Sequence, residues 1–83
     1  METTTALAVL QSALDHCRDE DIRTYKVLAA LDLLAAQSTD KWQWAFDQFR
    51  IAVFVNADSD GWEIEGRWQV LNAALNGIKG AVI

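Results

Sequence analysis

The chain has 83 residues, of which 52% are hydrophobic, and its twelve acids against seven lysines and arginines give a formal net charge of −5. This length predicts one domain, residues 1–83, whose core buries only about 60% of the surface that the unfolded chain exposes. A lone cysteine excludes an internal disulfide, and one histidine beside one cysteine argues against a zinc site. We therefore expect stability to come from dense packing or self-association.

The beginning of the chain, METTTALAVL, lacks the basic residues that start a signal peptide. The longest apolar run, VLAALDLLAA, is interrupted by Asp32 and is about half the length that crosses a bilayer. A net negative charge opposes direct binding to nucleic-acid phosphates and to acidic membranes. We therefore expect a cytoplasmic protein without a cofactor, and the single reduced cysteine agrees with that compartment.

Two helices are predicted in the first half of the chain. The first can be capped by Thr3, Thr4 or Thr5, and the second by Asp21, which ends the acidic run RDED. In the first helix the apolar positions recur at spacings of three and four and are Leu7, Leu10, Leu14 and Cys17. In the second helix they are Val27, Leu28, Leu31, Leu34 and Ala35, with Ala30 and Leu33 on a second side. This second helix is expected to be the most buried.

A third helix is predicted after the break QSTD, with Ser38 or Asp40 as its cap. One of its faces carries Trp42, Phe46, Phe49, Val53 and Asn56. A second face carries Trp44, Ile51 and Val55, with Gln48 between them. Two apolar faces on one helix need two partners, so one face is expected in the core and the other against a further helix or another chain.

The last segment repeats apolar residues at spacings that alternate between four and three. They are Ile64, Trp68, Leu71, Leu75, Ile78 and Val82. Gly66, Gly77 and Gly80 interrupt this pattern, and each glycine inside a helix costs about 1 kcal/mol relative to alanine. The helix is therefore expected to begin after Gly66 and to fray near its end.

An alternative interpretation places a β-hairpin at about residues 50–70. Residues 62–70 alternate between apolar and other residues, RIAVFV has high strand propensity, and ADSDG can close a turn. The fold would then be α+β. We favour an all-α fold, a compact single domain resembling a four-helix bundle, because no glycine, proline or asparagine interrupts residues 41–55.

In an up-down-up-down bundle, the first and third connections lie at the same end. These connections carry two acidic groups, which would then form one acidic pole. Its members would be Asp19, Glu20, Asp21, Asp58, Asp60 and Glu63. The opposite end carries little net charge, so the charge is predicted to be polarised along the bundle axis.

Asn56, Asp58, Asp60 and Gly61 match the first half of an EF-hand calcium loop. The twelfth position should be a bidentate glutamate, but it is Arg67, a positive charge. The favoured interpretation is therefore an acidic loop in which Gly61 permits the turn, and binding of a divalent cation is the alternative.

No pattern of catalytic residues stands out. His16 and Cys17 are neighbours, so on a helix their side chains point about 100° apart. Cys17 continues an apolar face and is expected in the core. The paired acids lie in polar segments without the apolar pocket that would raise the pKa of one of them. We therefore predict that the protein is not an enzyme.

The tryptophans divide into two pairs. Trp42 and Trp68 fall on the predicted core faces, whereas Trp44 and Trp62 do not. A tryptophan close to acids is typical of an anchor in a protein interface. We therefore predict contact with another macromolecule through these two tryptophans.

Together, these features predict a small acidic protein-binding module for a partner with a basic surface. Such a charge layout also suits an inhibitor or accessory factor that occupies a groove meant for nucleic acid. The predicted partner-binding residues are Trp44, Ile51, Val55, Asp58, Asp60, Trp62, Glu63, Asp19, Glu20 and Asp21. The alternative is a self-associating structural subunit, a homodimer whose seam contains Trp44, Ile51 and Val55 and can extend to the terminal residues AVI.

Overall fold

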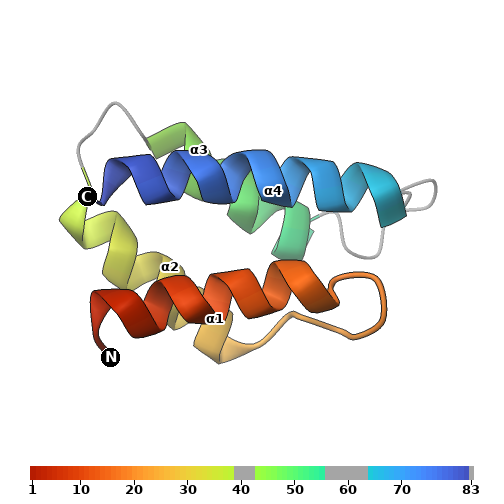
Figure 1. Ribbon diagram of the computed structural model, residues 1–83, viewed down its shortest axis with the longest axis horizontal. Coiled ribbons are helices and arrows are strands. Elements are labelled where there is room, and N and C mark those ends of the chain that lie inside the picture. Colours follow the sequence, from red (N-terminus) through yellow and green to blue (C-terminus); the bar gives the residue numbers. More distant parts are fainter. Residues whose placement is uncertain (39–42, 56–63, 83) are drawn as a thin grey trace.

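The computed structural model shows an all-α domain and describes residues 1–38, 43–55 and 64–82 (Figure 1). Its elements are α1 (Thr3–His16), α2 (Tyr25–Gln37), α3 (Gln43–Arg50), the π-helical segment η2 (Ile51–Val55) and α4 (Ile64–Ala81). Each helix packs against two others, α1 against α2 and α4, and α3 against α4 and α2. The predicted bundle-like fold is confirmed.

The hairpin alternative is wrong for the described part of residues 50–70. Residues 51–55 are helical, and residues 64–70 form the first turns of α4. The strand propensity of IAVFV is overridden because its residues continue the core face of α3. Phe46, Phe49 and Val53 are all buried, and this face closes against α4 and α2.

The core is apolar throughout the described residues, where no polar or charged side chain is fully buried. Every helix contributes to it. The largest fully buried side chains are Phe46, Phe49, Leu10, Leu31, Leu34, Leu71, Leu75, Ile78, Val53 and Cys17. Because each helix contributes an apolar face to the core, so short a chain can form a core without a disulfide.

The caps of α1 and α2 differ from those predicted. Glu2 occupies the N-cap position of α1 without a side-chain cap bond, so the three threonines lie inside the helix. The Thr3 hydroxyl instead donates a hydrogen bond to Gln37 Oε1 at 2.7 Å, which ties the start of α1 to the end of α2. The cap of α2 is Thr24, whose Oγ1 accepts from the backbone N–H of Val27 at 3.3 Å. Asp21 lies three residues too early because the preceding loop is longer than predicted.

The buried face of α2 is narrower than predicted. It consists of Val27, Ala30, Leu31 and Leu34, at spacings of three, one and three. Leu28, which we placed on the main face, is 39% exposed, since it lies about 100° around the helix from Val27, at the margin of the buried face. Leu33 and Ala35, the flanking apolar residues, are partly buried against the core.

Helix α4 is longer than predicted, because it begins at Ile64 and continues through all three glycines to Ala81. At Gly77 a side chain would not fit, because a Cβ atom built there would lie 2.9 Å from the Cβ atom of Ala45. Such a distance is below any real Cβ contact. Gly77 thus lets α3 and α4 approach each other closely at Ala45.

Candidate functional site

The most conspicuous surface feature is a row of apolar side chains along α3 and η2, which we call the α3 stripe. It consists of Trp44, Ile51 and Val55, with Gln48 between them. Trp44 is 49% exposed, Ile51 38% and Val55 65%. The sequence pattern separated this face from the core face, and the structure leaves it facing solvent. Its role in binding stays a prediction.

The α3 stripe is held in place by its neighbours. Ring atoms Cζ2 and Cη2 of Trp44 lie 3.6 and 3.8 Å from the Cβ position of Gly77, so the indole rests against the bare backbone of α4. Along one edge, Arg50 pairs with Asp47 at 3.6 Å and with Asp32 of α2 at 3.2 Å. The stripe is therefore an apolar strip with a network of one base and two acids, Arg50, Asp32 and Asp47, beside it.

A second exposed apolar pair lies on α2 and was missed by the sequence analysis. Tyr25 is 80% exposed and Leu28 is 39% exposed. Tyr25 directly follows the true cap, Thr24, so it belongs to the first turn of α2. Recognising Thr24 as the cap would have placed Tyr25 in the first turn of the helix.

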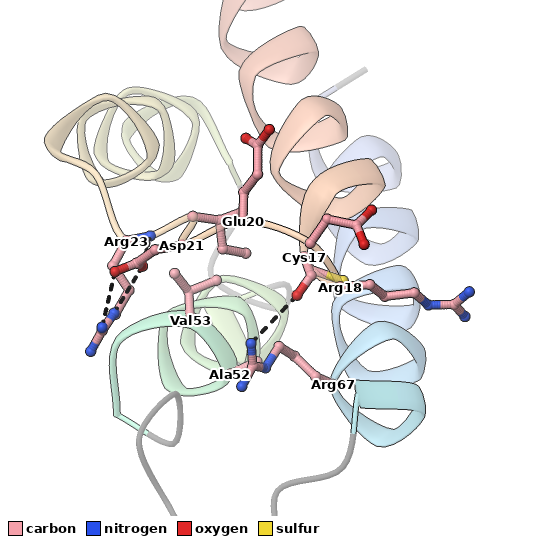
Figure 2. A pocket seen from close by; sticks show the side chains of 10 residues that line it. Cys17, Arg18, Glu20, Asp21, Arg23, Ala52, Val53 and Arg67 are labelled. Carbon is pink, nitrogen blue, oxygen red and sulfur yellow. Dashed lines mark hydrogen bonds and ion pairs between the residues drawn. The ribbon is translucent and has the colours of Figure 1, made fainter.

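At one end of the bundle, the connection from α1 to α2 lies beside η2 and the first turns of α4 (Figure 1). These elements surround an open cavity of about 330 Å³, shown in Figure 2. Its charged lining consists of Arg18, Asp19, Glu20, Asp21, Arg23 and Arg67. Three arginines thus offset the charge of Asp19, Glu20 and Asp21, the acids of the first predicted group. In the sequence analysis we counted the acids of this group and did not consider the arginines beside them.

Asp21 is fixed in this cavity by Arg23. Its Oδ1 accepts from the backbone N–H of Arg23 at 2.9 Å and from Nε at 3.0 Å, and its Oδ2 accepts from Nη2 at 3.0 Å. These bonds lower the pKa of the Asp21 carboxyl from 3.8 to about 2. All three acids, Asp19, Glu20 and Asp21, are exposed, but Asp21 is held in the loop by its bonds to Arg23.

The Asp21–Arg23 pair predicts an acid-sensitive loop. Because the pKa is lower in the folded state, the pair stabilises the fold above about pH 4, and this contribution is lost as the pH falls toward 2. The Asp21→Asn variant should show a flatter fall in stability across this window. Chemical-shift titration of the carboxyl carbon gives the direct measurement, with a midpoint near 2 expected. A midpoint at the ordinary value of 3.8 would show that the pair does not form.

Arg67 joins α4 to the end of α1. Its Nη1 donates to the carbonyl oxygen of Cys17 at 3.5 Å, where a cation is favoured by the dipole of α1. Close by, the Arg18 guanidinium lies 5.6 Å from the ring centroid of Trp68. The face of the helix predicted a core position for Trp68, but Trp68 is only partly buried, and the Arg18 guanidinium lies over its ring.

The His16–Cys17 pair has no geometry for nucleophilic catalysis. Cys17 is 2% exposed, and burial raises the pKa of its thiol above 9.0. His16 is exposed, with Nδ1 2.8 Å from the carbonyl oxygen of Ser12. That bond, and next the charge of Glu20, raises the pKa of His16 above 6.5. The expected core position of Cys17 is confirmed.

The remaining predicted site residues, Asp58, Asp60, Trp62 and Glu63, lie outside the described residues, as does the EF-hand-like run from Asn56 to Gly61. Within residues 1–38, 43–55 and 64–82, no group of three or more His, Cys, Asp or Glu side chains could hold a metal ion.

Most of the net negative charge of the chain lies in one short segment of the sequence. Eight residues, 58–65, contain four acids and no basic residue, so they account for −4 of the net charge of −5. They follow almost directly after Val55, the last residue of the α3 stripe. The acidic part of the predicted site is therefore a continuation of the apolar part along the chain.

No protein-family model, curated protein or solved structure matches the chain. Among the helices of the described ranges, none combines the length and the apolar character needed to span a bilayer.

Proposed function

We propose that the protein is a small binding module that contacts another protein through the α3 stripe. The observation that carries this proposal is the exposure of Trp44, Ile51 and Val55 in one row along α3 and η2. Large apolar side chains in such a row lose contact with water only when another surface covers them. The row is narrow, so its natural counterpart is a groove or the face of a single helix.

Trp44 is the expected anchor of this contact. About half of its surface is exposed, while the edge of its ring lies against Gly77. An anchored indole loses little conformational entropy on binding and still buries a large area, which is why tryptophan dominates many interfaces. Ile51 and Val55 extend the contact along the helix.

The partner is proposed to carry a basic surface beside its apolar contact. The acids of residues 58–65 follow the stripe along the chain, and exposed Asp19 and Glu20 add charge of the same sign. Acids placed next to an apolar anchor speed association with a basic partner more than they tighten it. A protein that binds nucleic acid through a basic groove fits this chemistry, and covering that groove would inhibit it. A shared cytoplasmic location, with Cys17 reduced, suits such a partner.

Photo-cross-linking from the stripe tests the proposal. A photoreactive residue at Gln48, which is exposed in the middle of the stripe, should cross-link a specific protein in cells of the source organism. With that protein purified, Trp44→Ala should weaken binding by at least about 30-fold, or about 2 kcal/mol. Reversing the charges of Asp58 and Asp60 should slow association and reduce its dependence on salt.

Tyr25→Ala is the matched control, because Tyr25 is an aromatic residue that is 80% exposed on a different helix. It should leave the affinity unchanged. If Trp44→Ala and the charge reversals bind like the wild type, the proposed contact is wrong. If Trp44→Ala weakens binding but salt and the charge reversals leave it unchanged, the α3 stripe binds the partner and the partner's basic surface takes no part.

A further inference from the structure

We propose that Arg67 is a positioning residue for the connection between α1 and α2, residues 17–24, and that this connection opens by itself when Arg67 is removed. The connection carries Asp19 and Glu20, two exposed acids of the proposed contact. The positioning stands on the contacts of Arg67 alone, whereas its importance for binding a partner rests on the proposed function.

Arg67 reaches across one end of the bundle. It lies in the first turn of α4 and is half-buried, with its Nε atom buried. Figure 2 shows its side chain extending from α4 toward the end of α1, where Nη1 donates to the carbonyl oxygen of Cys17 at 3.5 Å. It lines the cavity with Ala52 and Val53 of η2. One side chain therefore joins α4 to the residue at which the connection begins.

The charge of Arg67 acts on the same connection. Burial raises the pKa of the Cys17 thiol, and the nearby guanidinium of Arg67 opposes that rise. The hydrogen bonds from Arg23 lower the pKa of Asp21 to about 2, and the charge of Arg67 adds to that effect. The negative end of the α1 dipole also favours a cation here. A half-buried charge is costly without such surroundings, so the connection and Arg67 stabilise each other.

The connection is otherwise tied by apolar and local contacts. Cys17 and Ile22 are buried. The backbone N–H groups of Asp19 and Glu20 donate to the carbonyl oxygen of His16 at 3.1 and 3.0 Å. These backbone bonds close the end of α1 but do not reach another helix. The hydrogen bond from α4 does, so its loss should let residues 17–24 move away from α4 while the helices stay packed.

Cys17 reports on this opening without any label. It is the single cysteine of the chain and is 2% exposed, so its thiol reacts only when this end of the bundle opens. Removing the charge of Arg67 by itself would raise the pKa of the thiol and slow the reaction, because the thiolate is the nucleophile. Opening of the connection would instead speed the reaction. The two effects have opposite signs, so the reaction rate separates them.

The test is the rate at which an aromatic disulfide reagent modifies Cys17 in the folded protein at constant pH. Arg67→Met keeps an apolar stem and removes the charge, and it should react at least about tenfold faster than the wild type. Arg67→Lys keeps a cation and should react at an intermediate rate. Lys79→Met is the matched control, because Lys79 also reaches from α4 to α1, where it donates to Gln11 Oε1 at 3.1 Å. It should react like the wild type.

The dependence of this rate on urea identifies the kind of opening. For Arg67→Met, low concentrations of urea should hardly change the rate, because a local opening exposes little surface. A rate that rises in step with global unfolding would mean that Arg67 stabilises the whole domain, and it would overturn the proposal. A rate equal to or below that of the wild type would overturn it as well. Photo-cross-linking from Gln48 does not involve Cys17, so a failure of the proposed function would leave the thiol result standing.

Discussion

Replacing Phe49 by alanine should lower the free energy of unfolding by about 3–5 kcal/mol. Phe49 is fully buried in the last turn of α3, a helix that packs against both α2 and α4. Truncation removes the transfer free energy of the ring and leaves a cavity that close-packed neighbours fill only in part. A domain of this length has a total stability of roughly 4–12 kcal/mol, so the loss is a large part of the whole.

Urea unfolding followed by far-ultraviolet circular dichroism measures this effect. Tyr25→Ala is the control, because it truncates an aromatic side chain that is 80% exposed and should change stability by no more than about 0.5 kcal/mol. Equal losses in the two variants would mean that Phe49 does not lie in the core. Partial unfolding of Phe49→Ala without denaturant would agree with the expected loss.

The contrast between Phe49 and Trp44 shows how much of the fold can be predicted from the sequence. Both are aromatic residues of α3, five positions apart, and helical spacing alone assigns one to the core and the other to the surface. The same spacing identifies the buried face of α4. Hydrophobic periodicity succeeds here because each helix must bury one continuous face, whatever its neighbours are.

Features that depend on contacts between elements were not predictable in this way. Arg67 was considered only as a poor calcium ligand, yet it reaches across to the end of α1 at the Cys17 carbonyl. Asp21 was considered a cap, but the nearby guanidinium of Arg23 holds it in the loop. Long side chains choose among several partners, and the choice is fixed only when the helices have packed.

In the candidate site, too, some features follow from helical spacing and others depend on contacts between elements. The sequence predicts which residues of α3 and η2 avoid the core, and the structure leaves them partly exposed, although the edge of the Trp44 ring contacts α4 at Gly77. Of the three arginines that offset the acids of the first loop, only Arg67 comes from α4, and its place there depends on packing α4 beside that loop. Charge counted along the chain therefore overstates the acidity of this end of the bundle, and residues 58–65 hold most of the excess.

Replacing Gly77 by alanine should destabilise the protein by about 1–3 kcal/mol, although alanine is the better helix former. The added Cβ atom would lie 2.9 Å from that of Ala45. Both atoms are fixed to helix backbones, so relief requires α3 and α4 to separate. Gly80→Ala is the matched control on the same helix, since its Cβ atom would meet nothing within 4 Å. It should be neutral or stabilising by up to about 1 kcal/mol.

A double-mutant cycle with Ala45→Gly isolates the cause. If the clash is between these two Cβ atoms, the pair Ala45→Gly and Gly77→Ala should be more stable than the sum of the single changes by about 1 kcal/mol or more. Additive losses would mean that Gly77 acts through some other contact. Because the ring of Trp44 rests on the same backbone, Gly77→Ala should also change its fluorescence, whereas Gly80→Ala should not. The close approach at Gly77 would then both seal the core and hold the exposed indole in place.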